Sequence, residues 1–404
     1  MGEHPHTAAI GKGHPLTGTE VEDETRNGGI RDLAPACFAP VMATGIVSRA
    51  LDQATGARHA ADALLAAALA LHLVLLTATV ARAVRHRDRL AADLREPARF
   101  FGAFTLVAAT GVLASRLATG PLRPLAAAAP APAAALWAAL ALAGVRLLRT
   151  HGAAATRHAD GTWFLATVGL QSLVVTLTSL AHGPTARAVA LACWLAGVCL
   201  YAVTLCCVVR RLVLHPPGPA ELAPSYWILM GAAAISLLAG CGIPEGPATT
   251  AALLALWGWA TLLIPPLTAA GAWRHLRHRV PVRYEPALWS MVFPLGMYAT
   301  ATTRLATTRD LPLLRPWASD LAWCATTAWF AVAVLLLVRT VSRRGGHNSP
   351  ANPGDPPLVG AVGRWLAGGQ GGRAGSRQET GDEGCGTSGG VRWRRWRRRR
   401  YWRG

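Results

Sequence analysis

Charged side chains are scarce in this chain of 404 residues, of which only 15% are Asp, Glu, Lys or Arg. A water-soluble domain usually carries about 25% of these residues. The hydrophobic residues, 52% of the total, lie in long blocks rather than in amphipathic stripes. Such blocks are typical of helices whose solvent is lipid, so the composition excludes an ordinary soluble domain.

Ten hydrophobic blocks of roughly 18 to 26 residues are long enough to cross a bilayer as helices. Short loops join them, so we expect an all-α polytopic membrane protein with one domain over residues 32–340. Residues 1–31 are polar and carry five acidic groups without a basic region, which favours a cytoplasmic segment over a cleavable signal peptide. The predicted spans are 33–51, 63–81, 100–118, 128–148, 163–182, 186–209, 225–243, 249–272, 286–304 and 317–338.

Acidic residues are missing from the interiors of these blocks, and Asp320 falls only in the first turn of the last one. Proton-coupled carriers and pumps usually hold a carboxylate inside the membrane, and cation pathways use rings of Asp or Glu. A path through this domain would therefore favour anions or neutral solutes.

Motifs for metal or covalent chemistry are also missing. The eight cysteines form no Cys-x-x-Cys pair and no Cys/His pattern. The sequence contains no His-x-x-Glu-His and no Gly-x-Ser-x-Gly motif. We therefore expect no cofactor and no bound metal, and a membrane-embedded enzyme is a distant alternative.

Five glycines recur inside alternate blocks at separations of 66, 58, 62 and 65 residues. A near-constant interval that takes in two spans indicates one helical hairpin repeated five times. Residues 42–49 and 109–116 still resemble each other in sequence. We expect a quasi-five-fold arrangement in which the odd-numbered helices surround a central pore and the glycines leave it open, with close helix packing as the alternative. These glycines are Gly45, Gly111, Gly169, Gly231 and Gly296.

A small hydroxyl follows four of the glycines by three or four residues, so that both fall on one helix face. We interpret these hydroxyls as pore-lining groups that donate to a partly dehydrated anion. The alternative is a bond back to a carbonyl of the same helix. The seventh span departs from the pattern, since Ser236 follows its glycine by five residues. The four hydroxyls belong to Ser48, Ser115, Ser172 and Thr300.

Arginine lies at the far end of three odd-numbered spans, at Arg49, Arg116 and Arg304. Together they predict a positive vestibule that concentrates anions. Each side chain reaching singly to the lipid headgroups is the alternative.

The ninth span contains Trp289-Ser290-Met291-Val292-Phe293-Pro294-Leu295-Gly296-Met297-Tyr298. Pro294 cannot donate to the carbonyl four residues earlier and tends to kink a helix. Phe293 lies three residues before Gly296 and therefore shares its face. A bulky ring beside a kink, opposite four glycines, predicts a hydrophobic gate at Phe293, with ordinary packing as the alternative.

The arginines of the loops predict the orientation. With their flanks, the loops after spans 2, 4, 6 and 8 carry 15 arginines and the alternate loops carry 8. We therefore expect the even-numbered loops and both termini on the cytoplasmic side of the cell membrane.

Residues 341–404 hold 13 arginines against 4 acidic groups and are rich in Gly, Pro and Ser, which predicts a disordered cytoplasmic tail. Its Arg/Trp-rich end would lie on anionic lipid headgroups. RNA binding is a weaker alternative, and we expect no nucleic acid partner. A solvated tail without a role is a further reading.

Two segments carry a family resemblance: residues 38–48, Phe-Ala-Pro-Val-Met-Ala-Thr-Gly-Ile-Val-Ser, and residues 289–298. With the ten-span layout over residues 33–340, they resemble the tellurite-resistance/dicarboxylate transporter family. This family includes bacterial tellurite-resistance proteins, fungal malate and sulfite transporters and plant slow anion channels. The acidic N-terminal stretch and the Arg/Trp tail have no counterpart in the family.

The resemblance implies transport of small anions, such as C4-dicarboxylates, tellurite or sulfite. It also implies a homotrimer with one pore in each subunit, in which the odd-numbered helices are the inner ones. A phenylalanine of the ninth helix would block the pore, and Phe293 occupies that position. The hydroxyls and the arginine vestibule come from the residues alone.

A proton-linked dicarboxylate carrier is a competing hypothesis. His72 in the second span and His182 at the end of the fifth are the titratable candidates near the bilayer, because a histidine changes charge between about pH 5 and 8. A purely structural or signalling role is a further alternative, against which the five-fold repeat argues.

Overall fold

The computed structural model describes residues 29–218 and 221–345, and every regular element within these ranges is a helix. The ten predicted spans all overlap a long helix. The last helix continues to Gly345, five residues beyond the predicted end of the membrane domain. The expectations for residues 1–28 and for the tail beyond residue 345 lie outside the described residues.

Five helices form a closed ring at the centre. Each contacts the next in chain order, and the last contacts the first, so the predicted five-fold arrangement of odd-numbered helices is confirmed. The ring helices are α2 (Ala39–Ala54), α6 (Phe104–Leu117), α10 (Leu165–Leu180), α12 (Ile228–Gly240) and α14 (Trp289–Thr308).

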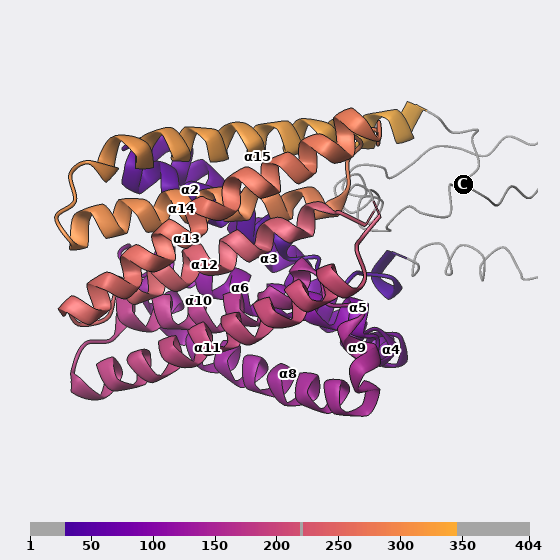
Figure 1. The fold of residues 1–404 in the computed structure, drawn as a ribbon, viewed down its shortest axis with the longest axis horizontal. Coiled ribbons are helices and arrows are strands. Elements are labelled where there is room, and N and C mark those ends of the chain that lie inside the picture. Colours follow the sequence, from indigo (N-terminus) through magenta and orange to yellow (C-terminus); the bar gives the residue numbers. More distant parts are fainter. Residues whose placement is uncertain (1–28, 219–220, 346–404) are drawn as a thin grey trace, which may run out of the picture.

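Five longer helices surround the ring and complete the hairpins. Figure 1 shows them side by side with the ring helices, all running roughly along one direction. The short helices α4 (Arg87–Arg95), α5 (Pro97–Phe100) and α9 (Ala153–Thr156) lie at the same end as the C-terminus of α15 (Figure 1). The peripheral helices are α3 (Arg58–Arg85), α8 (Pro130–His151), α11 (Pro184–Leu214), α13 (Pro247–Ala272) and α15 (Leu314–Gly345).

Burial separates the two sets. In the most hydrophobic window of Arg58–Arg85 only 11% of residues are buried, against 78% for Pro97–Leu117. Apolar surface on this scale is not left open to water by a soluble monomer. The peripheral helices therefore present their apolar side chains to lipid, while the ring helices bury theirs in the protein.

Among the residues that the structure describes, seven helices are long and apolar enough to cross a membrane, and Pro224–Gly240 is a shorter apolar helix. The two other ring helices, α2 and α14, pack between these. The chain is thus a multi-pass helical membrane protein, whereas the number of ten crossings stays a prediction.

One-turn 3-10 helices precede four of the ring helices. They are η1 (Phe101–Ala103), η2 (Gly161–Phe164), η3 (Pro224–Trp227) and η5 (Pro286–Leu288), and each contacts the next. A Cβ atom on Gly102 would lie 3.0 Å from the backbone nitrogen of Ala36, so only glycine permits this approach between the first two repeats. The N-terminal ends of the ring helices are thereby joined side by side.

Candidate functional site

A cavity of about 240 Å³ lies at the C-terminal ends of the ring helices. Its wall contains Arg49 from α2, Arg116 from α6 and Arg304 from α14, the three arginines that the sequence places at span ends. Hydroxyl groups, Gln53, His182 and one carboxylate, that of Asp52, complete the polar wall. We call this cavity the vestibule. Three guanidinium groups around one hollow produce a positive potential that attracts small anions.

A narrow extension of about 10 Å³, the neck, continues from the vestibule toward the middle of the ring. Arg49 and Ser115 line both spaces, and Gly111, Val112 and Met297 line the neck alone. This volume is close to the minimum of about 10–15 Å³ that holds one water molecule. The open space therefore narrows from a cavity that can hold several water molecules to one with room for about a single water molecule.

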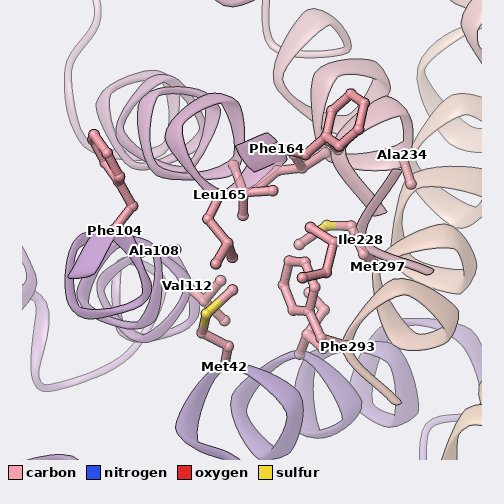
Figure 2. Packing of buried hydrophobic residues seen from close by; sticks show 14 of the residues in the cluster. Met42, Phe104, Ala108, Val112, Phe164, Leu165, Ile228, Ala234, Phe293 and Met297 are labelled. Carbon is pink, nitrogen blue, oxygen red and sulfur yellow. The ribbon is translucent and has the colours of Figure 1, made fainter. Parts of the chain in front are cut away.

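Beyond the neck, apolar side chains from all five ring helices fill the middle of the ring. Figure 2 shows Met42, Leu165, Phe293 and Ile228 pointing from different helices toward one another. We call these four residues, with Val112 and Met297, the plug. Each is at most 3% exposed, and the last two also line the neck, so the plug directly borders the neck.

Phe293 is the aromatic member of the plug. Its ring lies over the small residue Gly231 of α12, where an added Cβ atom would come within 3.3 Å of Phe293 Cε1. The helix α14 is continuous through Pro294, whose own ring contacts the same glycine. Of the five ring glycines, Gly231 is the one whose near neighbours include Phe293, and the role of Phe293 as a gate stays a prediction.

The sequence that forms this architecture matches a known protein family. The family model described as voltage-dependent anion channel, SLAC1, matches residues 32–337, which hold the ring, the vestibule and the plug. The chain belongs to the SLAC1 family. The resemblance drawn from residues 38–48 and 289–298 is confirmed at this level. Membership in this anion transport family points to a channel or transporter rather than an enzyme.

Individual relatives are also described as membrane proteins or transporters. An uncharacterized membrane protein of Mycobacterium tuberculosis is 40% identical over 159 residues, which cover 36% of this chain and 81% of that protein. An uncharacterized transporter of Methanocaldococcus jannaschii is 24% identical over 203 residues, 46% of this chain and 56% of its own length. A second one from that organism is 26% identical over 162 residues, with coverages of 36% and 45%.

The mid-span glycines do not leave a hole along the axis, and this expectation needs correction. A Cβ atom on Gly45 would lie 3.2 Å from Leu113 of α6, and one on Gly111 would lie 2.7 Å from Ser172 Cβ of α10. Gly296 lies against Ile46 of α2 in the same way. Gly231 faces Pro294 and Phe293 of α14, and Gly169 faces Trp137 of α8. The glycines allow neighbouring helices to approach closely, and of the five only Gly111 also lines the neck.

The four predicted hydroxyls divide into two that line the neck and two that do not. Ser115 and Ser172 line the neck, although each donates to a carbonyl of its own helix. Thr300 is fully buried and donates to the Gly296 carbonyl, 2.9 Å away and one turn back. Ser48 donates to the Ala61 carbonyl of peripheral helix α3, 2.6 Å away. The interpretation of Ser48 and Thr300 as pore-lining groups is not supported, because neither residue lines the vestibule or the neck.

Several vestibule residues were missed by sequence reasoning. Asp52 of α2 lines the vestibule and Asp62 of α3 lies outside its wall, and both lie within ion-pair distance of Arg116, at 3.5 and 3.2 Å. Thr178 and Ser179 of α10 add hydroxyls to the wall. A search for polar residues two to three turns beyond each glycine would have found the two hydroxyls, since residues on these turns lie near the same end of the helix.

The two histidines occupy different places. His72 Nε2 lies 3.5 Å from the Thr110 hydroxyl oxygen, and its ring meets Phe38 edge-on with centroids 5.5 Å apart. Both contacts link α3 to the ring, which is a packing role. His182, in contrast, lines the vestibule beside the arginines.

Proposed function

We propose that each subunit conducts small anions through the ring, entering at the vestibule and stopped by the plug. One observation carries this proposal: the arginine-lined hollow narrows onto Val112 and Met297, which belong with Phe293 to the plug. A positive mouth raises the local anion concentration. An apolar constriction prevents passage until it is widened, because a dehydrated ion has no polar partner there.

The substrates best suited to this path are small anions with oxygen acceptors, such as C4-dicarboxylates, sulfite or tellurite. Guanidinium and hydroxyl groups donate hydrogen bonds to such oxygens. The family resemblance supports a homotrimer of independent pores. The bias of loop arginines supports a cell-membrane location with both termini in the cytoplasm.

Replacing Phe293 tests the gate. In proteoliposomes with purified protein, we expect Phe293→Ala to raise anion flux about tenfold or more, which requires a barrier lower by only about 1.4 kcal/mol. Flux would be measured in turn with chloride, nitrate, sulfite, tellurite and malate. Phe330→Ala is the matched control, because Phe330 is 60% exposed on peripheral helix α15.

Removal of a buried Phe costs about 3–5 kcal/mol of stability, so folding is checked for each variant by its melting temperature in detergent. Phe293→Val, a smaller change, provides a second variant if the alanine protein does not fold. Unchanged flux in a folded Phe293 variant would refute the gate.

A proton-coupled carrier is the second candidate, and the place of His182 in the vestibule favours it. Malate uptake would then follow an imposed pH gradient at zero membrane potential. Flux that follows the potential and ignores the pH gradient would exclude this candidate and leave the channel.

A further inference from the structure

The connection between α13 and α14 is basic and contains no acidic residue. We call residues 273–284 the basic loop. They hold four arginines and two histidines, and the first Glu follows at position 285. The connection between α3 and α6 differs, because residues 82–99 hold six arginines together with three acidic residues. The arginines of the basic loop are Arg274, Arg277, Arg279 and Arg283.

The basic loop has a defined conformation. Its first turn, Trp273–Arg277, is π-helical. The Val280 backbone nitrogen donates to the Arg274 carbonyl at 3.3 Å, and His275 Nδ1 donates to the Val280 carbonyl at 2.8 Å. The Arg274 side chain also pairs with Glu285 at 3.2 Å, just before α14. Both ends of the loop are therefore fixed to the protein, and a ligand would meet a preformed surface.

The three other arginines of the loop point a positive charge at their surroundings. Arg277, Arg279 and Arg283 are exposed, and none of the ion pairs formed within residues 29–218 and 221–345 involves them. His278 is exposed as well, and its ring meets Trp273 edge-on with centroids 4.2 Å apart. Three uncompensated guanidinium groups so close in sequence attract an anionic partner.

Apolar side chains are exposed beside these arginines. Leu276 is 80% exposed, Val282 63% and Trp273 41%. The loop continues the span Pro247–Arg277, whose most hydrophobic window is only 17% buried and therefore faces lipid. Tryptophan at the end of such a helix is typical of the boundary between hydrocarbon and headgroups. Cations and apolar side chains on one segment at this boundary match the two parts of a phospholipid.

We propose that the basic loop binds an anionic phospholipid. Arg277, Arg279 and Arg283 bind the phosphate group, and Trp273 and Leu276 contact the acyl chains. A soluble phosphate compound leaves the apolar side chains without a partner, and a zwitterionic lipid has no net charge to compensate the arginines. The site lies at the N-terminal end of ring helix α14, opposite the vestibule, so it does not depend on the proposed conduction path.

Lipid binding to the full-length protein in detergent tests this site. Dioctanoyl phosphatidylglycerol is the anionic probe and dioctanoyl phosphatidylcholine the zwitterionic one. Each is titrated at one ionic strength, and native mass spectrometry measures the bound fraction. We expect phosphatidylglycerol to bind at least about tenfold more tightly, since each arginine near an anionic surface contributes about fivefold. Equal affinity for the two lipids would overturn the proposal.

Substitution of the exposed arginines locates the site. The triple variant Arg277→Gln, Arg279→Gln and Arg283→Gln should weaken phosphatidylglycerol binding at least about tenfold and leave phosphatidylcholine binding unchanged. Leu276→Ser should weaken phosphatidylglycerol binding about fivefold, because less apolar surface is covered by the acyl chains. Melting temperatures in detergent check that each variant folds, and Leu276→Ser serves alone if the triple variant does not.

A second triple variant is the matched control. Arg85→Gln, Arg87→Gln and Arg89→Gln remove the same charge from three exposed arginines at the end of α3 and in α4. Their phosphatidylglycerol affinity should stay within about twofold of the parent, because Asp88 already compensates part of that charge. Equal losses in the two triple variants would show that the lipid follows net charge alone, and the site would be refuted.

Competition with glycerol phosphate separates a lipid from a soluble phosphate compound. Glycerol phosphate carries the same phosphate chemistry without acyl chains, and we expect it to displace phosphatidylglycerol only at concentrations at least about tenfold higher. Displacement at equal concentration would overturn the assignment to a lipid. None of these titrations measures anion flux, so a negative result here leaves the proposed conduction path standing, and a failed flux assay leaves the lipid site standing.

Discussion

The ring helices and the peripheral helices have similarly apolar sequences, yet different contacts hold them in place. The ring is joined by glycines that neighbouring helices touch, as at Gly111 and Gly296. In peripheral helix α13, an added Cβ atom on Gly258 or Gly271 would meet nothing within 4 Å. A glycine in a peripheral helix is a close contact where it faces the ring, as Gly197 of α11 does against Gln171 of α10, and open space where it does not.

Peripheral helices are anchored instead by arginines near their C-terminal ends. Arg82 of α3 pairs with Asp93 at 2.6 Å, and Arg211 of α11 donates to the Tyr226 hydroxyl at 2.6 Å. Arg274, just after α13, pairs with Glu285 at 3.2 Å. Three of the arginines counted for orientation therefore also bind the peripheral helices to the rest of the protein. In lipid, the hydrophobic effect does not drive apolar helices together. Hydrogen bonds and ion pairs of this kind therefore add specificity to their packing.

The strongest test of this contrast is the anchor at Arg82. Its residue is 3% exposed, and it also donates to the Arg31 carbonyl at 2.9 Å. Arg82→Ala leaves Asp93 with Arg99 alone, and we expect a loss of about 3 kcal/mol, as for other broken buried pairs. The readout is the melting temperature in detergent. Arg85, about one turn further along α3, is exposed, so Arg85→Ala should have the melting temperature of the parent. An equal loss of melting temperature in both variants would contradict the anchoring role of Arg82.

A smaller effect is expected from the ring glycines. Gly111→Ala forces a methyl group onto Ser172 of α10 and should cost about 1–3 kcal/mol, the usual range for overpacking. Gly258→Ala has free space and better helix propensity, so its melting temperature should stay level or rise. Comparable losses in the two variants would mean that ring and periphery tolerate volume alike.

The smallest expected effect is on the pH dependence of stability, at a contact between two repeats. Asp160 accepts from the Thr162 backbone nitrogen at 3.0 Å and from the Ser225 hydroxyl at 3.3 Å. Burial raises the pKa of its carboxyl, and the bonds from Thr162 and Ser225 pull the pKa down less strongly. The folded protein therefore holds this proton more tightly than the unfolded chain does.

A raised pKa contributes stability that is present below the unfolded value, about 4, and is lost as pH rises through the folded value. We expect the parent to lose melting temperature relative to Asp160→Asn as the pH increases from about 4. Asp88→Asn, on exposed α4, is the control and should follow the parent at every pH. A constant difference between parent and Asp160→Asn would contradict the assigned sign.

Sequence reasoning succeeded where it needed only the type of a residue and the end of the helix on which that residue lies. Arg49, Arg116 and Arg304 were expected to share one end of the ring, and they line one hollow. It failed where the direction of a side chain mattered. Ser48 and Ser172 each follow their glycine by three residues, yet Ser48 donates to α3 and Ser172 lines the neck. Ser115 and Thr300 each follow theirs by four residues, yet of these two only Ser115 lines the neck.

The sequence by itself determined that the chain is a helical membrane protein built from five hairpins, with the odd-numbered helices inside. Long apolar blocks and a regular glycine spacing are one-dimensional properties, and lipid allows them few other solutions. Only the tertiary structure decided that the glycines join helices rather than open a path, and that Asp52 and Asp62 neutralise Arg116. These outcomes depend on how each helix is rotated about its own axis, which is set by side-chain packing across the ring and not by spacing along the chain.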